Sequence, residues 1–257
     1  MKELIEQEFQ KLKNPSKSIV LQKFFKTNKG EYAEGDLFLG IMVPQVRILV
    51  KKYPHLSIKL LSQIIQSPYH EIRLFSLLSL VQQFKNISKD KNLSLEEKKE
   101  KHLKIVNLYT KNIAFINNWD LVDLSARDII GEYLYLYKTS KEQIEFLSSL
   151  ASEKKVFVRK DRDKLWEKRI AVLSTFQFLY YQIPKPTLII CELLLHDTHD
   201  LIHKATGWML REMGKKCGLD YLRNFLTRFS KTMPRTMLRY AIEKLNPEER
   251  KKWMAKV

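Results

Sequence analysis

The strongest constraint on the fold is a helix start that recurs along the chain. Five segments place a basic residue at the start of an apolar run with helical spacing: PQVRILVKK, HEIRLFSLLSL, WEKRIAVLSTF, IHKATGWMLRE and RTMLRYAIEKL. In the last three, Arg169, Lys204 and Arg239 follow one another at intervals of 35 residues. Helix pairs at such a period bury their apolar faces only against neighbouring pairs. We therefore expect an all-α repeat solenoid whose basic residues line a concave groove; the alternative is that they only solvate helix ends.

The rest of the sequence is also helical in pattern. It has only 7 Gly and 8 Pro in 257 residues, and no stretch alternates strictly between apolar and polar side chains. We expect a single domain over 1–257, with the segment 91–104 as a solvated charged insertion and a loop near 152–163. Helices are predicted, from their capping and breaking residues, at 2–12, 17–26, 44–53, 57–66, 69–85, 94–114, 119–137, 141–151, 155–159, 163–181, 186–195, 199–215, 219–229, 234–245 and 248–255.

The charge balance favours a polyanionic partner. Lys and Arg number 46 against 29 Asp and Glu, which gives a formal net charge of +17. Cys191 and Cys217 are too few for a disulfide framework or a four-cysteine zinc site, so a reducing compartment is expected. The N-terminus lacks the apolar stretch of a signal peptide. The most apolar window, 170–183, is shorter than the roughly 20 residues that span a bilayer, so we expect a cytoplasmic protein without a membrane helix.

Several familiar catalytic patterns are missing. The sequence has no glycine-rich phosphate loop before a helix, no GxSxG motif and no cysteine-protease signature. His196, His199 and His203 have metal-like spacing, but no carboxylate of the HExxH type accompanies them. Their position favours a helix N-terminus instead, with Asp197, Thr198 or Asp200 as the capping residue.

Tryptophans stand among basic residues at helical spacing. Lys204, Trp208, Arg211 and Lys215 occupy one stripe of a helix, and Trp166 and Arg169 share a face of another. The 16 residues from 154 to 169 hold eight basic and three acidic side chains. This interleaving predicts a surface that grips phosphates while the indoles pack against the nucleic-acid backbone. The alternative is that Trp208 turns inward and the charged side chains extend around it.

The motif NNWDLVD at 117–123 adds a carboxylate to this basic setting. Asn117 or Asn118 is expected to cap a helix that begins at Trp119, and Asp120 suits the positive end of that helix dipole. Asp123 has no such role, because it lies past the first turn on the same side as Trp119. A carboxylate that faces DNA is repelled by phosphate unless it meets a cation.

Such a cation forms when the N-glycosidic bond of a nucleotide breaks. The sugar becomes oxocarbenium-like, and a nearby carboxylate stabilises it or positions the attacking water. An alkylated purine is itself cationic and leaves without a general acid, and electron-rich indoles favour the same charge. Asp123 and Trp119 are therefore candidate catalytic residues.

Six segments together resemble the DNA alkylation repair glycosylases of the AlkD type, which are built from HEAT-like or ARM-like repeats. They are GIMVPQVRILVKK, HEIRLFSLLSL, NNWDLVD, LWEKRIAVL, HKATGWMLRE and MPRTMLRYAIEK, and they span about residues 35–245. The resemblance implies release of N3- and N7-alkylated purines from duplex DNA by a monofunctional glycosylase without metal or cofactor, with the base left in the stack. It places the catalytic residues at Asp123, Trp119, Trp208 and Arg169.

The remaining site predictions concern DNA binding and competing functions. The resemblance puts Arg211 and Lys215 at the DNA backbone, and Lys204, Trp166 and Arg239 are expected to support the same contact. A monomer suffices for a groove that binds DNA. Two alternatives stay open: a non-catalytic helical-repeat protein that binds nucleic acid, and a solenoid that binds other proteins.

Overall fold

The computed structural model describes residues 1–152 and 164–255, and these residues fold into helices. No β-strand occurs among them, and Leu37 and Tyr69 form an isolated bridge. The all-α prediction is confirmed. The chain divides into two compact units, Met1–Ser125 and Ala126–Val257, so the expectation of one domain stays a prediction. None of the described helices has the length and apolar character needed to cross a membrane.

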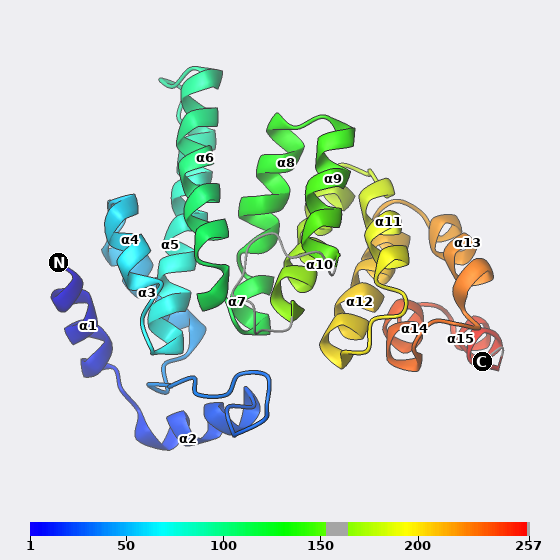
Figure 1. Cartoon of the computed structure of the whole chain (residues 1–257), viewed down its shortest axis with the longest axis horizontal. Coiled ribbons are helices and arrows are strands. Elements are labelled where there is room, and N and C mark those ends of the chain that lie inside the picture. The colour runs from blue at the N-terminus through cyan, green and yellow to red at the C-terminus, as the bar shows by residue number, and fades with distance from the viewer. Residues whose placement is uncertain (153–163, 256–257) are drawn as a thin grey trace. The chain divides into compact units, whose positions relative to one another are not determined.

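The first unit is built around one long buried helix. α5 contacts α3, α4, α6 and α7, and its first half is almost entirely buried, including its polar residues (Figure 1). The unit comprises α1 (Lys2–Lys11), α2 (Pro15–Phe24), α3 (Val43–Lys52), α4 (Ile58–Ile64), α5 (His70–Lys89), α6 (Leu95–Lys111), the 3₁₀ turn η1 (Ile113–Phe115) and α7 (Trp119–Asp123).

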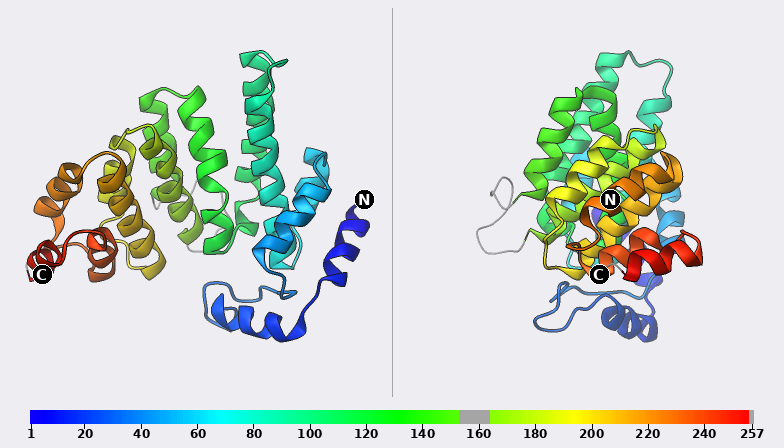
Figure 2. Two further views of the ribbon diagram at one scale, coloured as in Figure 1. Left: turned by 180° about the vertical axis from the view of Figure 1, so that it is seen from behind. Right: turned by 90° about the vertical axis from the view of Figure 1, so that its right-hand side faces the viewer.

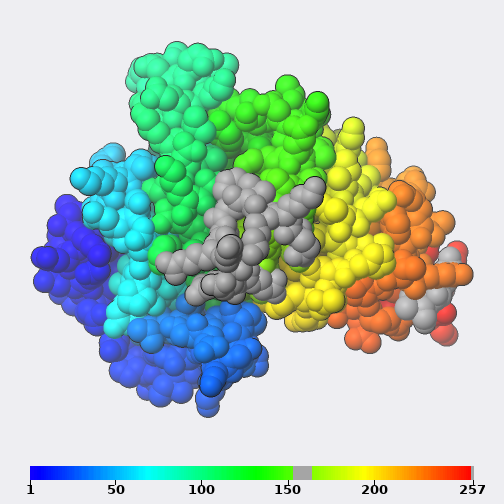
Figure 3. Space-filling model, viewed as in Figure 1, coloured from blue at the N-terminus to red at the C-terminus, as the bar shows by residue number. Residues whose placement is uncertain are grey.

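Capping residues explain where several of these helices begin. Asn14 caps α2 just before Pro15, and Ser57 caps α4. At α6, the Ser94 side chain accepts the N–H of Glu97, whose carboxylate accepts the N–H of Ser94. The start of α6 lies within the charged insertion predicted at 91–104, and it projects beyond α4 (Figure 3). Its largely exposed side chains agree with a solvated segment.

The second unit consists of helix pairs stacked in two layers. η2, α10, α12 and α14 pack side by side in one row, and α9 and α11 pack against each other in the other layer, with α13 beside α12 (Figure 2). The elements are the π-helical η2 (Arg127–Gly131), α8 (Glu132–Tyr137), α9 (Ser140–Ala151), α10 (Leu165–Tyr180), α11 (Lys185–Leu193), α12 (Asp200–Lys216), α13 (Leu219–Phe229), α14 (Arg235–Ile242) and α15 (Pro247–Ala255). This is the arrangement of a helical repeat.

The 35-residue interval corresponds to this repeat. Arg169, Lys204 and Arg239 are each the fifth residue of their helix, on α10, α12 and α14. The three helices are successive members of one row, since α10 packs on α12 and α12 packs on α14. The period read from the sequence therefore marks structurally equivalent positions.

One predicted helix is interrupted, and one prediction falls outside the described residues. The helix expected over 119–137 ends at Asp123, turns at Leu124 and Ser125, and resumes with η2. The Ser125 hydroxyl donates to the Leu121 carbonyl four residues earlier, which competes with the regular helical bond. The short helix at 155–159 and most of the loop near 152–163 belong to residues 153–163, which the structure does not describe.

Candidate functional site

Trp119 and Asp123 occupy one side of the short helix α7. The side chain of Asn118 accepts the N–H of Trp119 at 2.8 Å and thereby begins the helix, which confirms the predicted cap. Trp119 and Asp123 are half-buried, whereas Asp120 and the apolar Leu121 and Val122 are buried. The helix thus keeps its middle in the core and leaves its first and last residues partly accessible.

The end of α7 rests on a buried hydroxyl pair. Tyr109 on α6 is fully buried, and its hydroxyl lies 3.1 Å from that of Ser125. Burial raises the pKa of the Tyr109 phenol. The hydrogen bond with Ser125 lowers this pKa, and the negative charge of Asp123 raises it. Tyr109 therefore stays protonated and donates to its neighbour, and its hydroxyl supports the turn that follows Asp123.

The indole of Trp119 lies against two phenylalanines from the N-terminal segment. The ring of Phe25 stacks on it with centroids 5.2 Å apart, and Phe24 meets it edge-on at 5.8 Å. Phe25 is buried, while Phe24 is exposed. The indole of Trp119 therefore packs against the buried ring of Phe25 on one side and contacts the exposed ring of Phe24 edge-on.

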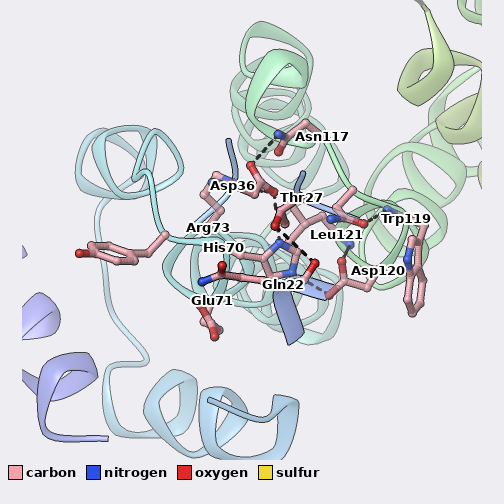
Figure 4. A network of polar contacts seen from close by, with 12 residues as sticks. Gln22, Thr27, Asp36, His70, Glu71, Arg73, Asn117, Trp119, Asp120 and Leu121 are labelled. Carbon is pink, nitrogen blue, oxygen red and sulfur yellow. Dashed lines mark hydrogen bonds and ion pairs between the residues drawn. The ribbon is translucent and has the colours of Figure 1, made fainter. Parts of the chain in front are cut away.

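A buried polar network fixes the start of α7, and it was not predicted (Figure 4). Nε2 of His70 lies 2.9 Å from Oδ2 of Asp120. Asp36 accepts bonds from Arg73 at 2.7 Å and from Asn117 at 2.9 Å. Burial alone would raise the pKa of the Asp36 carboxyl, but the adjacent His70, Arg73 and Asn117 hold it below its usual value. The signal in the sequence was the set of polar residues His70, Glu71 and Arg73 at the start of an apolar helix.

In the second unit, the predicted stripe on α12 is present. Lys204, Trp208 and Arg211 are half-buried and Lys215 is exposed, while the helix buries its apolar residues on its other side. Lys204 pairs with Asp200 at 2.6 Å, and Arg211 bonds to Glu243 and, at 3.3 Å, to Glu212. The stripe therefore consists of two cations paired with carboxylates, Lys204 and Arg211, together with the exposed Lys215 and the partly accessible indole of Trp208.

The basic residues of the five recurring helix starts were expected to line a groove. For Arg73 and Arg169 this expectation is wrong, because both side chains are buried. Arg73 is 3% exposed and Arg169 is 5% exposed. Arg73 is paired with Asp36 and donates to the carbonyls of Ser67 and Pro68, and Arg169 donates to the carbonyl of Leu201 at 2.7 Å. These internal bonds offset the cost of burying a guanidinium. Trp166, three residues before Arg169 on α10, is half-buried.

Two cavities carry basic residues around α14. A cavity of about 260 Å³ is bordered by Arg211, Lys215 and Lys244. A second of about 600 Å³ is lined by Arg239, Tyr240, Ile242, Glu243, Pro247, Arg250, Lys251 and Met254. In the second unit, Arg211, Lys215 and Arg239 thus line cavities to which residues of α14 also contribute.

A cation–aromatic cluster of the second unit was missed in the sequence. The guanidinium of Arg127 lies 5.6 Å from the Phe176 ring and 5.3 Å from the Tyr180 ring, and the Lys216 ammonium lies 3.8 Å from Tyr180. Phe176 also lies 6.0 Å from Trp208, so the cluster continues the stripe of α12. These residues come from η2, α10 and α12, and no local motif links them.

The histidine-rich segment forms a helix start, although not with the expected cap. His199 is the N-cap of α12, and its Nδ1 accepts the N–H of Leu201 at 3.1 Å. Asp197 cannot take this place, because it pairs with Lys168 at 2.8 Å and accepts the N–H of His199. Within residues 1–152 and 164–255, no group of three His, Cys, Asp or Glu side chains is arranged to hold a metal ion.

Comparisons with known proteins agree on one family. A family model described as DNA alkylation repair enzyme matches residues 5–245. The solved structure of a predicted DNA alkylation repair enzyme from Enterococcus faecalis is similar in fold, with a TM-score of 0.62 and 16% sequence identity. The match covers 91% of this chain and 97% of that one. No curated protein sequence matches this chain.

Proposed function

Because the chain belongs to the DNA alkylation repair enzyme family, we propose that it is a monofunctional glycosylase that releases N3- and N7-alkylated purines from duplex DNA. The observation that carries the proposal is the pair Trp119 and Asp123 on one side of α7, in the motif NNWDLVD. Both side chains are partly accessible, as residues that meet a substrate must be.

The chemistry needs one carboxylate. As the glycosidic bond breaks, positive charge develops on the sugar, and the Asp123 carboxylate stabilises it and orients the attacking water. The indole face of Trp119 favours the same cation. The alkylated purine carries a positive charge in the ground state and leaves as a neutral base, so neither a general acid nor a metal or cofactor takes part.

The second unit supplies further contacts in this proposal. Trp208 acts on the lesion side, and Lys204, Arg211, Lys215, Trp166 and Arg239 hold the DNA backbone. Arg169, predicted on the lesion side from the sequence, is buried, and its bond to the Leu201 carbonyl makes it a residue that joins α10 to α12. Recognition through the backbone leaves the damaged base in the stack, in contrast to enzymes that rotate it into a pocket.

The decisive experiment compares Asp123→Asn with the parent on methylated duplex DNA, with chromatographic identification of the free bases. We expect the parent to release 7-methylguanine, and the variant to release at least about a hundredfold less at similar DNA affinity. Asp128→Asn is the matched control, because it removes a half-buried carboxylate that pairs with Arg127, and it should retain release. Equal activity of Asp123→Asn and the parent would refute the assignment.

The alternative function has a distinct outcome in the same assay. A non-catalytic nucleic-acid-binding protein would bind the methylated duplex but release no base, in the parent and in both variants. Binding would then be as strong for undamaged DNA as for methylated DNA, because phosphate contacts do not distinguish the two.

A further inference from the structure

A buried imidazole joins α5 to the first turn of α7. His70 begins α5 and is 2% exposed, and its Nε2 bonds to Asp120 in α7. The other carboxylate oxygen of Asp120 accepts the N–H of Leu121 at 2.9 Å. Asp120 therefore links the imidazole directly to the backbone of the helix that carries Asp123.

A second carboxylate holds the other side of the same turn. Asp36 anchors Asn117, the residue just before the cap of α7, and its Oδ2 lies 3.7 Å from Nδ1 of His70. This distance is too long for a hydrogen bond but short for two opposite charges. His70 thus lies between two carboxylates: Asp36, which accepts from Asn117 before the cap of α7, and Asp120, which accepts from the backbone of Leu121 within α7.

Ring packing couples the imidazole to Trp119. The His70 ring lies 4.5 Å from the ring of Phe38 and 5.1 Å from that of Phe25, and Phe25 stacks on Trp119. In a close-packed interior, a shift of the imidazole is passed to its neighbours. Movement of His70 would therefore tilt Trp119 and, one turn later, Asp123.

We propose that His70 is a positioning residue for Asp123, and that protonation of its imidazole between Asp120 and Asp36 keeps α7 in its active orientation. The inference rests on the proposed glycosylase activity. His70 touches no substrate in this scheme, and it acts through the two carboxylates and the turn that they hold.

The two protonation states of His70 differ in their fit to this site. The imidazolium carries an N–H on both nitrogens, whereas the neutral ring with Nε2–H turns a lone pair toward Asp36. Burial favours the neutral ring, yet the charge and hydrogen bond of Asp120, together with Asp36, raise the pKa of His70 above its ordinary value; Arg73 opposes this. The groups that face the imidazole are thus Asp120 from α7, Asp36 from the segment before α3, and Arg73 from α5.

The pH dependence follows with a definite sign. Since the pKa is higher in the folded protein, the imidazolium stabilises the fold fully below the unfolded value of about 6.5, and this contribution is lost as pH rises through the folded pKa. The same step removes the N–H that faces Asp36. Base release should therefore fall on the alkaline side, over the range in which His70 loses its proton.

The test measures single-turnover release of 7-methylguanine between pH 5.5 and 8.5. Asp36→Asn keeps the bond from His70 to Asp120 but removes one carboxylate, so it should lower the pKa of His70 and move the alkaline fall of the rate to lower pH. His70→Gln should lower the rate at pH 6.5 about tenfold and flatten the profile, with DNA affinity within about threefold of the parent.

His102→Gln is the matched control for burial. His102 is also buried in the first unit, stacks on Phe84 at 3.6 Å, and bonds to the Phe84 carbonyl instead of a carboxylate. Burial lowers the pKa of His102, so its protonation opposes folding as pH falls, the opposite of His70. His102→Gln should destabilise the protein yet keep the alkaline fall where it is in the parent.

Two further outcomes separate the possible failures. An unchanged alkaline fall in Asp36→Asn would overturn the positioning role, whatever its effect on stability. If the parent releases no base, the proposed function fails, and ¹⁵N NMR of the imidazoles together with ¹⁹F-labelled tryptophan still tests the coupling in the parent. The chemical shift of the Trp119 signal should then change with the same pKa as His70. A Trp119 signal that does not follow the titration of His70 would refute the coupling.

Discussion

At the scale of single residues, the buried carboxylate of Glu71 offers a test of what holds the segment before α3. Its oxygens accept the backbone N–H groups of Leu39, Gly40 and Ile41 at 2.8 to 3.1 Å. Glu71→Gln removes the negative charge and replaces one carboxylate oxygen with an NH2 group that cannot accept, so it should lower the free energy of unfolding by about 2 kcal/mol in urea titrations. The exposed Glu34 accepts one bond, from Gly30, so Glu34→Gln should change it by under about 0.5 kcal/mol.

Residues of the candidate site whose roles depend on neighbours in sequence could be predicted, whereas those whose partners are distant in sequence could not. Asn118 was found because capping depends on a single residue and the helix beside it. The role of His70 was not, because its partners Asp36 and Asp120 lie 34 and 50 residues away and meet it only in the folded chain. Arg169 was expected on a surface, since a sequence does not show that the carbonyl of Leu201 receives it.

At the scale of helices, two glycines of α12 separate backbone contact from side-chain contact. A Cβ at Gly207 would lie 2.5 Å from the Met237 carbonyl oxygen of α14, whereas one at Gly214 would meet the movable side chain of Leu222 at 3.0 Å. Gly207→Ala should therefore lower the free energy of unfolding by about 2 kcal/mol, despite its better helix propensity. Gly214→Ala should stay within about 1 kcal/mol of the parent. Urea unfolding measures the free energy of unfolding of both variants. If Gly207→Ala lowers it no more than Gly214→Ala does, α12 and α14 can move apart enough to admit the added methyl group.

Helix positions were predictable because periodicity and caps are written locally. The described helices begin and end within a few residues of the predicted ranges, and the 35-residue interval corresponds to successive helices of one row. The break after Asp123 was not predictable, since residues 119–137 keep a helical pattern throughout. It depends on the Ser125 hydroxyl, which Tyr109 of another helix also contacts.

At the scale of the whole molecule, composition fixes the net charge of +17, but packing decides which cations reach a partner. Arg73 and Arg169 are buried with internal partners, so they are not part of the exposed charge. Arg239 is exposed, and lines a cavity together with Arg250 and Lys251. The count of basic residues therefore overstates the number of phosphates that the protein can neutralise.

Salt dependence measures that number. If about six phosphates are neutralised, the affinity for duplex DNA should fall about 10³-fold between about 50 and 200 mM salt, by fluorescence anisotropy. Lys215→Gln combined with Arg239→Gln removes two exposed cations of the second unit and should reduce the slope of log K against log salt by about two. Lys91→Gln combined with Lys99→Gln removes the same charge from the solvated insertion and should leave the slope unchanged. A flat response in the parent would exclude a DNA-binding role, because binding to a polyanion releases counterions, and the solenoid that binds other proteins would then be the remaining alternative.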